Sequence, residues 1–245
     1  MSGIGTLNER SLHAALKRWY ARPGDEFEAT VEGYVVDIVR DDLLVEIQTR
    51  GFSAMKRKLR DLTDRHRVRL VYPIPRERWV VRLAPGGNGV HSRRKSPLHG
   101  DVELLFNELV SVPDLLAHPS FAVHVLLIQE ERVRRFDPTR RGCRRWVPCE
   151  RRLLEVCDER LFRSPADLAD LLPDGLPDPF TTGDLSTALR RPRRLAQRMA
   201  YCLRALELIE PVGRSAGGVA YARCAAGPRR GVTILGTEPF RSIGT

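Results

Sequence analysis

The chain has 245 residues and a mass of 27.8 kDa, enough for one large domain or two small ones, each with its own core. With 42% apolar and 29% charged residues it is not a disordered chain, a collagen or a disulfide miniprotein. Its 41 Lys and Arg against 31 Asp and Glu give a formal net charge of +10. This excess favours a polyanionic partner such as nucleic acid, although codon bias in a GC-rich genome also produces arginine-rich chains.

No apolar run approaches the roughly 20 residues of a membrane span, and the amino terminus lacks the apolar core of a secretory signal. The five cysteines include no CxxC pair, so neither a disulfide framework nor a zinc knuckle is indicated. We therefore expect a protein of the reducing cytoplasm with no membrane partner.

The first 80 residues predict a helix, three strands, a second helix and a fourth strand. Leu12, Leu16, Trp19 and Tyr20 recur at helical spacing after a cap at Asn8. Strands are expected at 26–34, 35–40 and 43–49, a helix from Gly51 to about Leu62, and a strand at 68–73. This mixture indicates an α/β fold with a mixed central sheet.

The middle of the chain is less regular. We expect a strand at 79–83, a glycine-rich turn at 85–89, a helix at 101–116 and a buried strand at 121–129. Residues 132–145 are rich in arginine and are interpreted as a connector between domains. The basic runs at 93–95 and 140–145 could follow a nucleic acid, but such runs are more often solvated loops.

The last third predicts three helices and a hairpin, which is the order of a winged helix-turn-helix domain and would make the second domain mainly α. The helices are expected at 150–162, from Thr181 or Thr182 to Arg190, and from Pro192 to about Leu206. Strands at 208–212 and 219–223 complete the hairpin.

Two acidic side chains are expected to face each other on neighbouring strands. A two-residue loop at Asp41-Asp42 would pair Asp37 with Glu46, and Gln48 would project from the same face as Glu46. Like charges in that position call for a cation or a shared proton. Glu9 falls within the apolar stripe of the first helix and would point at the same sheet. Such hard oxygen ligands suit Mg²⁺ or Mn²⁺.

This pattern resembles the PD-(D/E)XK, or restriction-endonuclease-like, nuclease superfamily, with its αβββαβ core. The resemblance covers residues 5–75 and implies that Asp37, Glu46 and the Ile47 carbonyl hold Mg²⁺, with Glu9 as the helix acid. Gln48 stands where the motif has lysine, as in ExQ variants, and an amide cannot deprotonate the attacking water. The catalytic set implied is therefore Glu9, Asp37, Glu46 and Gln48.

With this resemblance, the domains are expected at 1–136 (nuclease-like, with an extension), 137–148 (basic linker), 149–224 (winged helix-turn-helix) and 225–245 (disordered tail). The polar stripe of the third C-terminal helix, with one residue of the wing, has the residue types that contact phosphates and bases: Arg193, Arg194, Gln197, Tyr201, Arg204 and Arg214. Protein contact or dimerisation through that helix is the alternative.

Other interpretations of the acidic pair stay open. Arginines such as Arg40 or Arg50 could neutralise Asp37 and Glu46 in a purely structural role. Lys56 could replace the missing cation, although a solvated lysine is the more common case, and Lys58 is expected to point away. His13 borders the buried stripe and could approach the carboxylates, although packing is the more common role.

The leading hypothesis is a metal-dependent nuclease, a phosphodiester hydrolase, docked on double-stranded DNA by a winged helix. A non-catalytic DNA-binding regulator with a degenerate nuclease-like domain is the alternative, and Gln48 is the feature that divides the two. A protein-interaction scaffold is the third reading, and weak, salt-insensitive nucleic-acid binding would indicate it. Double-strand cleavage by a single-site enzyme would favour a homodimer.

Overall fold

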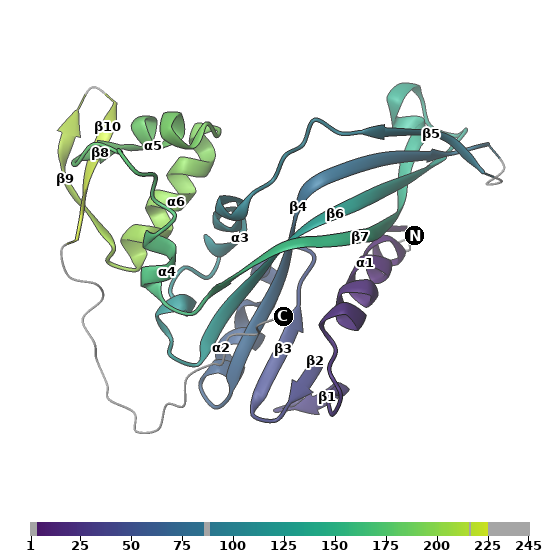
Figure 1. The fold of residues 1–245 in the computed structure, drawn as a ribbon, viewed down its shortest axis with the longest axis horizontal. Helices are drawn as coiled ribbons and strands as arrows, with labels where there is room; N and C mark the ends of the chain where they lie inside the picture. Colours follow the sequence, from purple (N-terminus) through teal and green to yellow (C-terminus); the bar gives the residue numbers. More distant parts are fainter. Residues whose placement is uncertain (1–3, 86–88, 216, 225–245) are drawn as a thin grey trace.

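The structure is a mixed α/β arrangement with one large and one small sheet (Figure 1). The computed structural model describes residues 4–85, 89–215 and 217–224, with side chains from residue 11 onward except those of residues 143 and 144. The large sheet has the order β1-β2-β3-β4-β6-β7, with β5 paired to β4. Its strands are β1 (Glu26–Val31), β2 (Tyr34–Arg40), β3 (Leu43–Ile47), β4 (Arg67–Leu83), β5 (Val90–Lys95), β6 (Phe121–Phe136) and β7 (Trp146–Phe162).

The first part of the chain forms the elements predicted for it. Helix α1 (Ile4–Tyr20) precedes the antiparallel strands β1, β2 and β3. Helix α2 (Lys56–Thr63) then crosses over to β4, which runs parallel to β3. The predicted two-residue turn is confirmed, because Arg40 pairs with Leu43 and Ile38 pairs with Val45.

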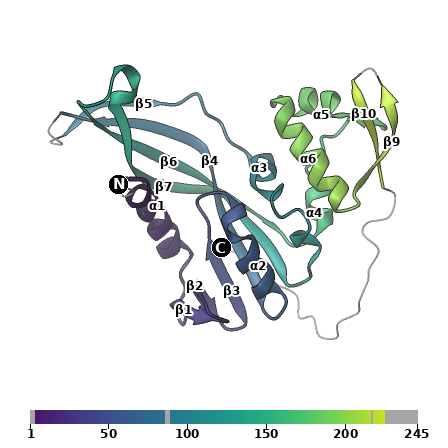
Figure 2. The same ribbon diagram turned by 180° about the vertical axis from the view of Figure 1, so that it is seen from behind.

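The large sheet is covered on both faces. Leu12 and Leu16 of α1 are buried in a cluster with residues of β2, β3 and β6 on one face. Leu59 and Leu62 of α2 belong to a larger cluster on the other face. The two helices lie on either side of β3 in both views (Figures 1 and 2). Any side chain at the open end of β2 and β3 can therefore be reached from both helices.

The middle of the chain departs from prediction. The helix expected at 150–162 is wrong, because these residues belong to β7, which pairs antiparallel with β6 from Val123↔Phe162 to Phe136↔Trp146. The arginine-rich connector is instead the turn region of this long hairpin, and the expected strand at 79–83 is the end of β4. The helix expected at 101–116 is reduced to 3₁₀ turns and α3 (Phe106–Leu109).

The C-terminal unit contains six short elements, of which the second and third helices and the final hairpin were predicted. They are α4 (Pro165–Ala169), β8 (Phe180–Thr181), α5 (Thr182–Leu189), α6 (Arg193–Ala205), β9 (Ile209–Ser215) and β10 (Gly218–Arg223). Thr181 caps α5 by accepting hydrogen bonds from the Gly183 and Asp184 amides, both at 3.2 Å. The three strands form the small sheet β8-β10-β9.

The C-terminal unit packs directly on the large sheet's helical layer. Arg191 contacts Glu103 at 2.6 Å, and Arg198 donates to the Asn107 side chain at 2.6 Å. The apolar face of α6 joins the core cluster that contains α2 and α3. Because β7 extends to Phe162 in the large sheet, residues 149–162 do not belong to the C-terminal unit, which corrects the boundary expected at 137–148.

Part of the sequence-based description lies outside the described residues, namely the tail at 225–245 and positions 86–88 of the glycine-rich turn. No helix within the described part of the chain is long and apolar enough to cross a bilayer.

Candidate functional site

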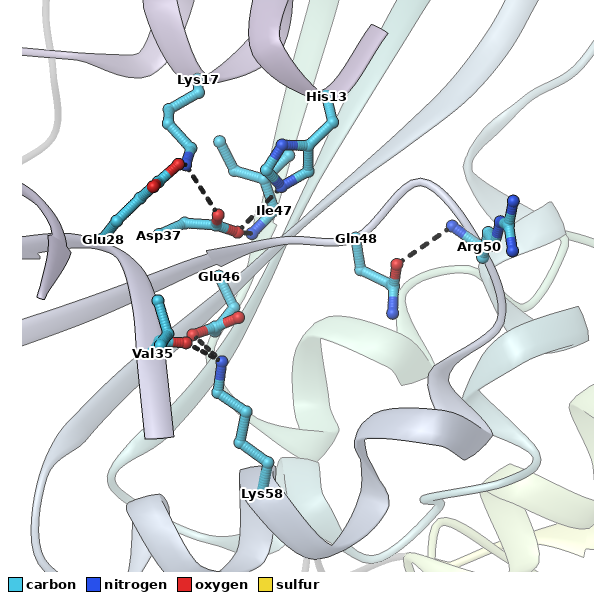
Figure 3. Close-up of polar contacts among 10 residues, drawn as sticks. All are labelled: His13, Lys17, Glu28, Val35, Asp37, Glu46, Ile47, Gln48, Arg50 and Lys58. Carbon is cyan, nitrogen blue, oxygen red and sulfur yellow. Dashed lines mark hydrogen bonds and ion pairs between the residues drawn. The ribbon is translucent and has the colours of Figure 1, made fainter. Parts of the chain in front are cut away.

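The candidate site lies where β2 and β3 separate. The ladder between the two strands ends at Ile38↔Val45, one residue pair before Asp37 and Glu46. Asp37 instead turns its carboxylate toward β3 and accepts a hydrogen bond from the Ile47 amide at 2.9 Å. The expected cross-strand pair is therefore wrong in one respect. The two acids are neighbours, but they do not pair with each other across the ladder, and each is held by a different helix (Figure 3).

Asp37 is held from α1. His13 Nε2 lies 3.0 Å from Asp37 Oδ2, and Lys17 Nζ lies 3.0 Å from Oδ1. Burial raises the pKa of the Asp37 carboxyl, but the hydrogen bond and charge of His13, the Ile47 amide and Lys17 outweigh it and lower that pKa to about 2. Asp37 is therefore ionised at neutral pH and already carries two partners.

Glu46 is held from α2 on the opposite side. Lys58 Nζ lies 2.5 Å from Glu46 Oε1 and donates to the Val35 carbonyl at 2.6 Å. The Glu46 residue is only 3% exposed. Burial raises the pKa of its carboxyl, the Lys58 charge opposes that effect, and the nearby Asp37 charge adds to it. The pKa values of the two acids are therefore shifted in opposite directions, as in many sites that handle protons or cations.

The cations at the site are not those that the sequence favoured. Arg40 pairs with Asp25 at 2.7 Å and donates to the Tyr20 carbonyl, so it does not neutralise Asp37. The Arg50 amide donates to Gln48 Oε1 at 3.2 Å. Lys56 is exposed, whereas Lys58, expected to point away, contacts Glu46.

Sequence reasoning missed Lys17, although a signal for it was present. Lys17 lies one turn after His13 on α1, so both side chains share the face that meets Asp37. Lys58 had no local signal of this kind. Its position depends on how α2 is rotated against β3 after the crossover, which tertiary packing sets.

The two acids, His13 and Lys58 line one pocket of about 400 Å³. Its lining includes four residues of the predicted site, namely Asp37, Glu46, Ile47 and Gln48. The other lining residues are His13, Val35, Thr49, Arg50, Met55 and Lys58. Gln48 lies at the rim, and its side-chain oxygen accepts from the Arg50 amide rather than contacting either acid (Figure 3). Glu9 is in α1 one turn before His13, and its side chain lies outside the described set.

The donor atoms around this pocket include hard oxygens suited to a divalent cation. Within the described side chains, however, no group of three or more His, Cys, Asp or Glu is arranged to hold a metal ion. Asp37 and Glu46 supply two carboxylates, and both are engaged by ammonium groups. A cation entering the pocket would therefore have to displace Lys17 and Lys58 or share the carboxylates with them.

The predicted nucleic-acid residues of α6 and the hairpin lie on the surface. Arg194, Gln197, Tyr201, Arg204 and Arg214 are exposed, and Arg193 is exposed while donating to the Gly217 carbonyl at 2.6 Å. The apolar stripe predicted for the same helix is confirmed, since Leu195, Met199, Cys202, Leu203 and Leu206 are buried. The two faces of α6 are thus divided as the sequence indicated.

Comparison with known proteins places the chain in a family. A family described as a domain of unknown function (DUF8091) matches residues 10–163, and the chain belongs to it. The matched region begins in α1 and ends just after β7, so it coincides with the large sheet. An uncharacterized protein of Treponema pallidum (strain Nichols) is 34% identical over 187 residues, which cover 75% of this chain and 73% of that protein. No solved structure matches the chain.

Proposed function

We propose that this protein is a metal-dependent DNA nuclease with a restriction-endonuclease-like domain over residues 4–162 and a winged helix-turn-helix domain over residues 163–224. The observation that carries the proposal is the pocket of about 400 Å³ in which Asp37, Glu46, Ile47 and Gln48 meet at the open end of β2 and β3. The order of elements around it supports the first domain: a helix, three antiparallel strands, a crossover helix and a parallel strand.

The residues at the pocket fit Mg²⁺ or Mn²⁺ by the chemistry of their donors. Asp37, Glu46 and the Ile47 carbonyl would hold the ion, and Glu46 Oε1 is a buried carboxylate oxygen with no hydrogen-bond donor among the described residues beyond its ion pair with Lys58. A bound divalent ion supplies charge neutralisation at the phosphate and lowers the pKa of its water. The ion would have to compete with two ammonium groups, which predicts weak metal binding without substrate.

The protein's own residues would prepare the phosphate. Lys58 would supply the positive charge that the motif lysine supplies in the nuclease superfamily, where this chain has Gln48. Its ammonium group contacts Glu46 in the pocket that Gln48 also lines. When Lys58 is released from Glu46, its ammonium group can pair with a phosphate oxygen. The Gln48 amide can orient a water by hydrogen bonding but cannot take its proton. His13, whose imidazole contacts Asp37, lines the same pocket.

The C-terminal unit supports DNA as the substrate. Its order α4-β8-α5-α6-β9-β10 is that of a winged helix, and the exposed face of α6 carries Arg194, Gln197 and Arg204. A guanidinium and an amide on a helix surface are suited to phosphates and base edges. A homodimer would place one such site at each strand of the DNA duplex. The proposal therefore also predicts a homodimer.

Supercoiled plasmid incubated with Mg²⁺ or Mn²⁺ tests the catalytic part. The wild type should nick the plasmid, and Asp37→Asn and Glu46→Gln should each lower the rate by at least about 100-fold, because each removes a ligand charge. Asp42→Asn is the matched control, since Asp42 is an exposed aspartate in the turn of the same hairpin. Nicking that survives in both site variants overturns the catalytic assignment.

A non-catalytic DNA-binding regulator is the second candidate, and one observation favours it. Both site carboxylates are neutralised by the chain's own cations, as they would be in a domain that no longer binds metal. Calorimetric titration separates the two functions. Metal binding that is lost in Asp37→Asn supports the nuclease, whereas DNA binding without metal binding or nicking supports the regulator.

A further inference from the structure

The chain's net positive charge is concentrated at one end of the large sheet. The distal parts of β4, β5, β6 and β7 project beyond α1 and, with the described residues next to them, form what we call the basic arm, residues 76–85, 89–97 and 130–152 (Figure 1). These three ranges contain 15 Lys and Arg against 5 Asp and Glu. Their excess of ten positive charges equals the net charge of the whole chain. The remaining residues are therefore balanced, and the basic character is a local property of the arm.

Strand register gathers many of these charges on one face. Arg94 and Arg132 both pair with Val80, and Arg132 also pairs with Arg151, so the three arginines form a row across the arm. Two residues further along, Arg82 pairs with Arg134. Because side chains of paired residues share a face and alternate residues return to it, these five arginines project from the same side.

This face belongs to the side of the sheet on which α1 and the pocket lie. Leu126 and Ile128 of β6 contact the α1 cluster, and Arg132 and Arg134 follow them at even spacing on the same strand. Arg151 connects the face to the pocket, because it donates to the carbonyl of Thr49, a pocket residue, at 3.3 Å. The arginine rows therefore continue outward from the rim of the candidate site.

The chain neutralises only the inner part of this face. Glu130 is fully buried and contacts Arg78, Arg132 and Arg151 at 2.5, 3.3 and 2.7 Å. Among the described side chains, no carboxylate pairs with Arg82, Arg94 or Arg134, and Nε of both Arg82 and Arg134 is buried without a hydrogen-bond partner. Like charges placed directly opposite each other destabilise a sheet. An external anion would remove that cost.

The side chains beside the outer row are fixed by aromatic contacts. The Arg82 guanidinium lies 4.9 Å from the centre of the Trp146 ring, and the His91 ring stacks on the same Trp146 ring with a centroid distance of 5.7 Å. These contacts hold Arg82 in an ordered position near Arg134. An ordered row of guanidinium groups loses less side-chain entropy when it binds phosphates than flexible surface lysines do.

We propose that the α1-side face of the basic arm binds the phosphate backbone of duplex DNA and leads the duplex to the pocket. Arg82, Arg94 and Arg134 make the phosphate contacts, and Arg151 marks the junction with the site. This inference deepens the proposed function, because it rests on DNA as the partner, and it assigns a second contact surface apart from α6. Binding at phosphates alone gives no sequence preference and releases counterions.

The test is the salt dependence of binding, measured by fluorescence anisotropy with a labelled 30-base-pair duplex in EDTA, so that neither metal nor cleavage is needed. In Arg82→Gln/Arg134→Gln, the slope of log Kd against log salt should become shallower by about 1.8, about 0.9 for each phosphate contact. At 100 mM salt the affinity should fall at least tenfold. Arg94→Gln alone, at an exposed position, should change the slope by about half as much.

Arg57→Gln/Arg65→Gln is the matched control, because it removes the same charge from two exposed arginines outside the arm, one in α2 and one between α2 and β4. Its slope should equal that of the wild type, since salt screens charges beyond about 10 Å. Thermal melting curves show whether the variants are folded. The arm variant should be at least as stable as the wild type alone, and duplex DNA should raise its Tm less than it raises that of the wild type.

Each outcome separates this inference from the nuclease. An arm variant that binds like the control overturns the arm proposal, even if nicking depends on Asp37. Arm-dependent DNA binding without any nicking supports the arm and counts against the nuclease. Binding of anionic phosphatidylserine vesicles in place of DNA overturns the choice of partner. If the slope of log Kd against log salt is unchanged in both Arg82→Gln/Arg134→Gln and Arg94→Gln, the arm proposal is also overturned.

Discussion

The pocket and the basic arm are both built from charged residues, but they balance charge in different ways. In the pocket, each acid has a cation from a helix packed on the sheet: Asp37 has Lys17 and His13, and Glu46 has Lys58. In the arm, one buried carboxylate, Glu130, serves three arginines, and further arginines stand opposite one another. The pocket is therefore neutral without a ligand, whereas the arm is not.

This difference indicates what each region can bind. A ligand of the pocket must displace an internal ion pair, so its affinity is reduced by the strength of that pair. A ligand of the arm displaces water and mobile counterions and gains affinity in a salt-dependent way. The arm is thus suited to attract a polyanion. The pocket is suited to bind only those groups of the polyanion that can displace its internal ion pairs.

The largest expected effect concerns the buried carboxylate of the arm. Glu130→Gln leaves Arg78, Arg132 and Arg151 without their shared counter-charge in a buried position. Removing one partner of a buried ion pair destabilises a protein by about 3–5 kcal/mol. Urea denaturation should show this loss. Glu150→Gln is the control, because Glu150 pairs with Arg152 nearer the surface and should change stability by less than about 1 kcal/mol.

Equal stability of the Glu130→Gln and Glu150→Gln proteins would contradict the comparison. It would mean that the inner arginines of the arm do not need a carboxylate for stability. The lack of carboxylate partners in the outer row would then not indicate that this row binds an anionic ligand.

The sequence allowed the pocket to be predicted better than the arm, and the reason is the range of the interactions. The turn at Asp41-Asp42 and the alternation along β2 and β3 are local, so Asp37 and Glu46 could be placed together from a few residues. The contacts of the Asp37 carboxylate with the Ile47 amide and with Lys17 of α1, and the end of the ladder before Glu46, have no local sequence pattern that predicts them.

Strand β7, which enters the arm, was wrongly predicted as a helix because part of it has a helical spacing of apolar residues. Leu153, Val156 and Leu161 of β7 are spaced as on one face of a helix, yet this segment pairs with β6 over its whole length. Its bulges, at positions such as Ile128/Val156 and Glu130/Leu153, shift the alternation, so a period of two is not preserved. Long-range pairing with β6 decided the structure against the helical pattern.

A second prediction tests whether the pocket is neutral as built. The pKa of Asp37 is lowered from 3.8 to about 2 on folding, so the ionised carboxylate stabilises the fold above pH 3.8. That stabilisation, about 2 kcal/mol, is lost as the pH falls from 3.8 through 2. Urea denaturation at pH 5 and pH 2 should therefore show a larger acid loss for the wild type than for Asp37→Asn, and Asp42→Asn should resemble the wild type.

An acid loss that is identical in all three proteins would show that His13 and Lys17 do not hold Asp37 in solution. The lowered pKa would then have no structural basis, and the pocket would present a free carboxylate to a metal ion.

A third prediction concerns the other carboxylate and has the opposite pH sign. The pKa of Glu46 is raised by burial, so its ionisation costs more in the folded state than in the unfolded state. Lys58→Met removes the opposing charge and raises that pKa further, and stability should fall as the pH rises through it. We expect a loss of about 1–2 kcal/mol at pH 8 and a smaller loss at pH 5, because the lower pH favours the uncharged carboxyl.

Lys56→Met is the matched control for Lys58→Met, because it removes an exposed lysine from the same helix. It should leave stability unchanged at both pH values. A pH-independent loss in Lys58→Met would assign the lysine a packing role rather than neutralisation of Glu46.

The smallest expected effect is the response of the free protein to salt, and it compares the two regions directly. Salt screens repulsion among the partly exposed outer arginines of the arm but weakens the buried pocket pairs much less. Raising NaCl from 50 to 500 mM should therefore stabilise the wild type by less than about 1 kcal/mol, the size of a single cross-strand charge pair. The gain should be smaller in Arg82→Gln/Arg134→Gln and unchanged in Lys58→Met. A gain that persists in the arm variant would place the repulsion elsewhere in the chain, and the arm would then have no unfavourable charge for DNA to relieve.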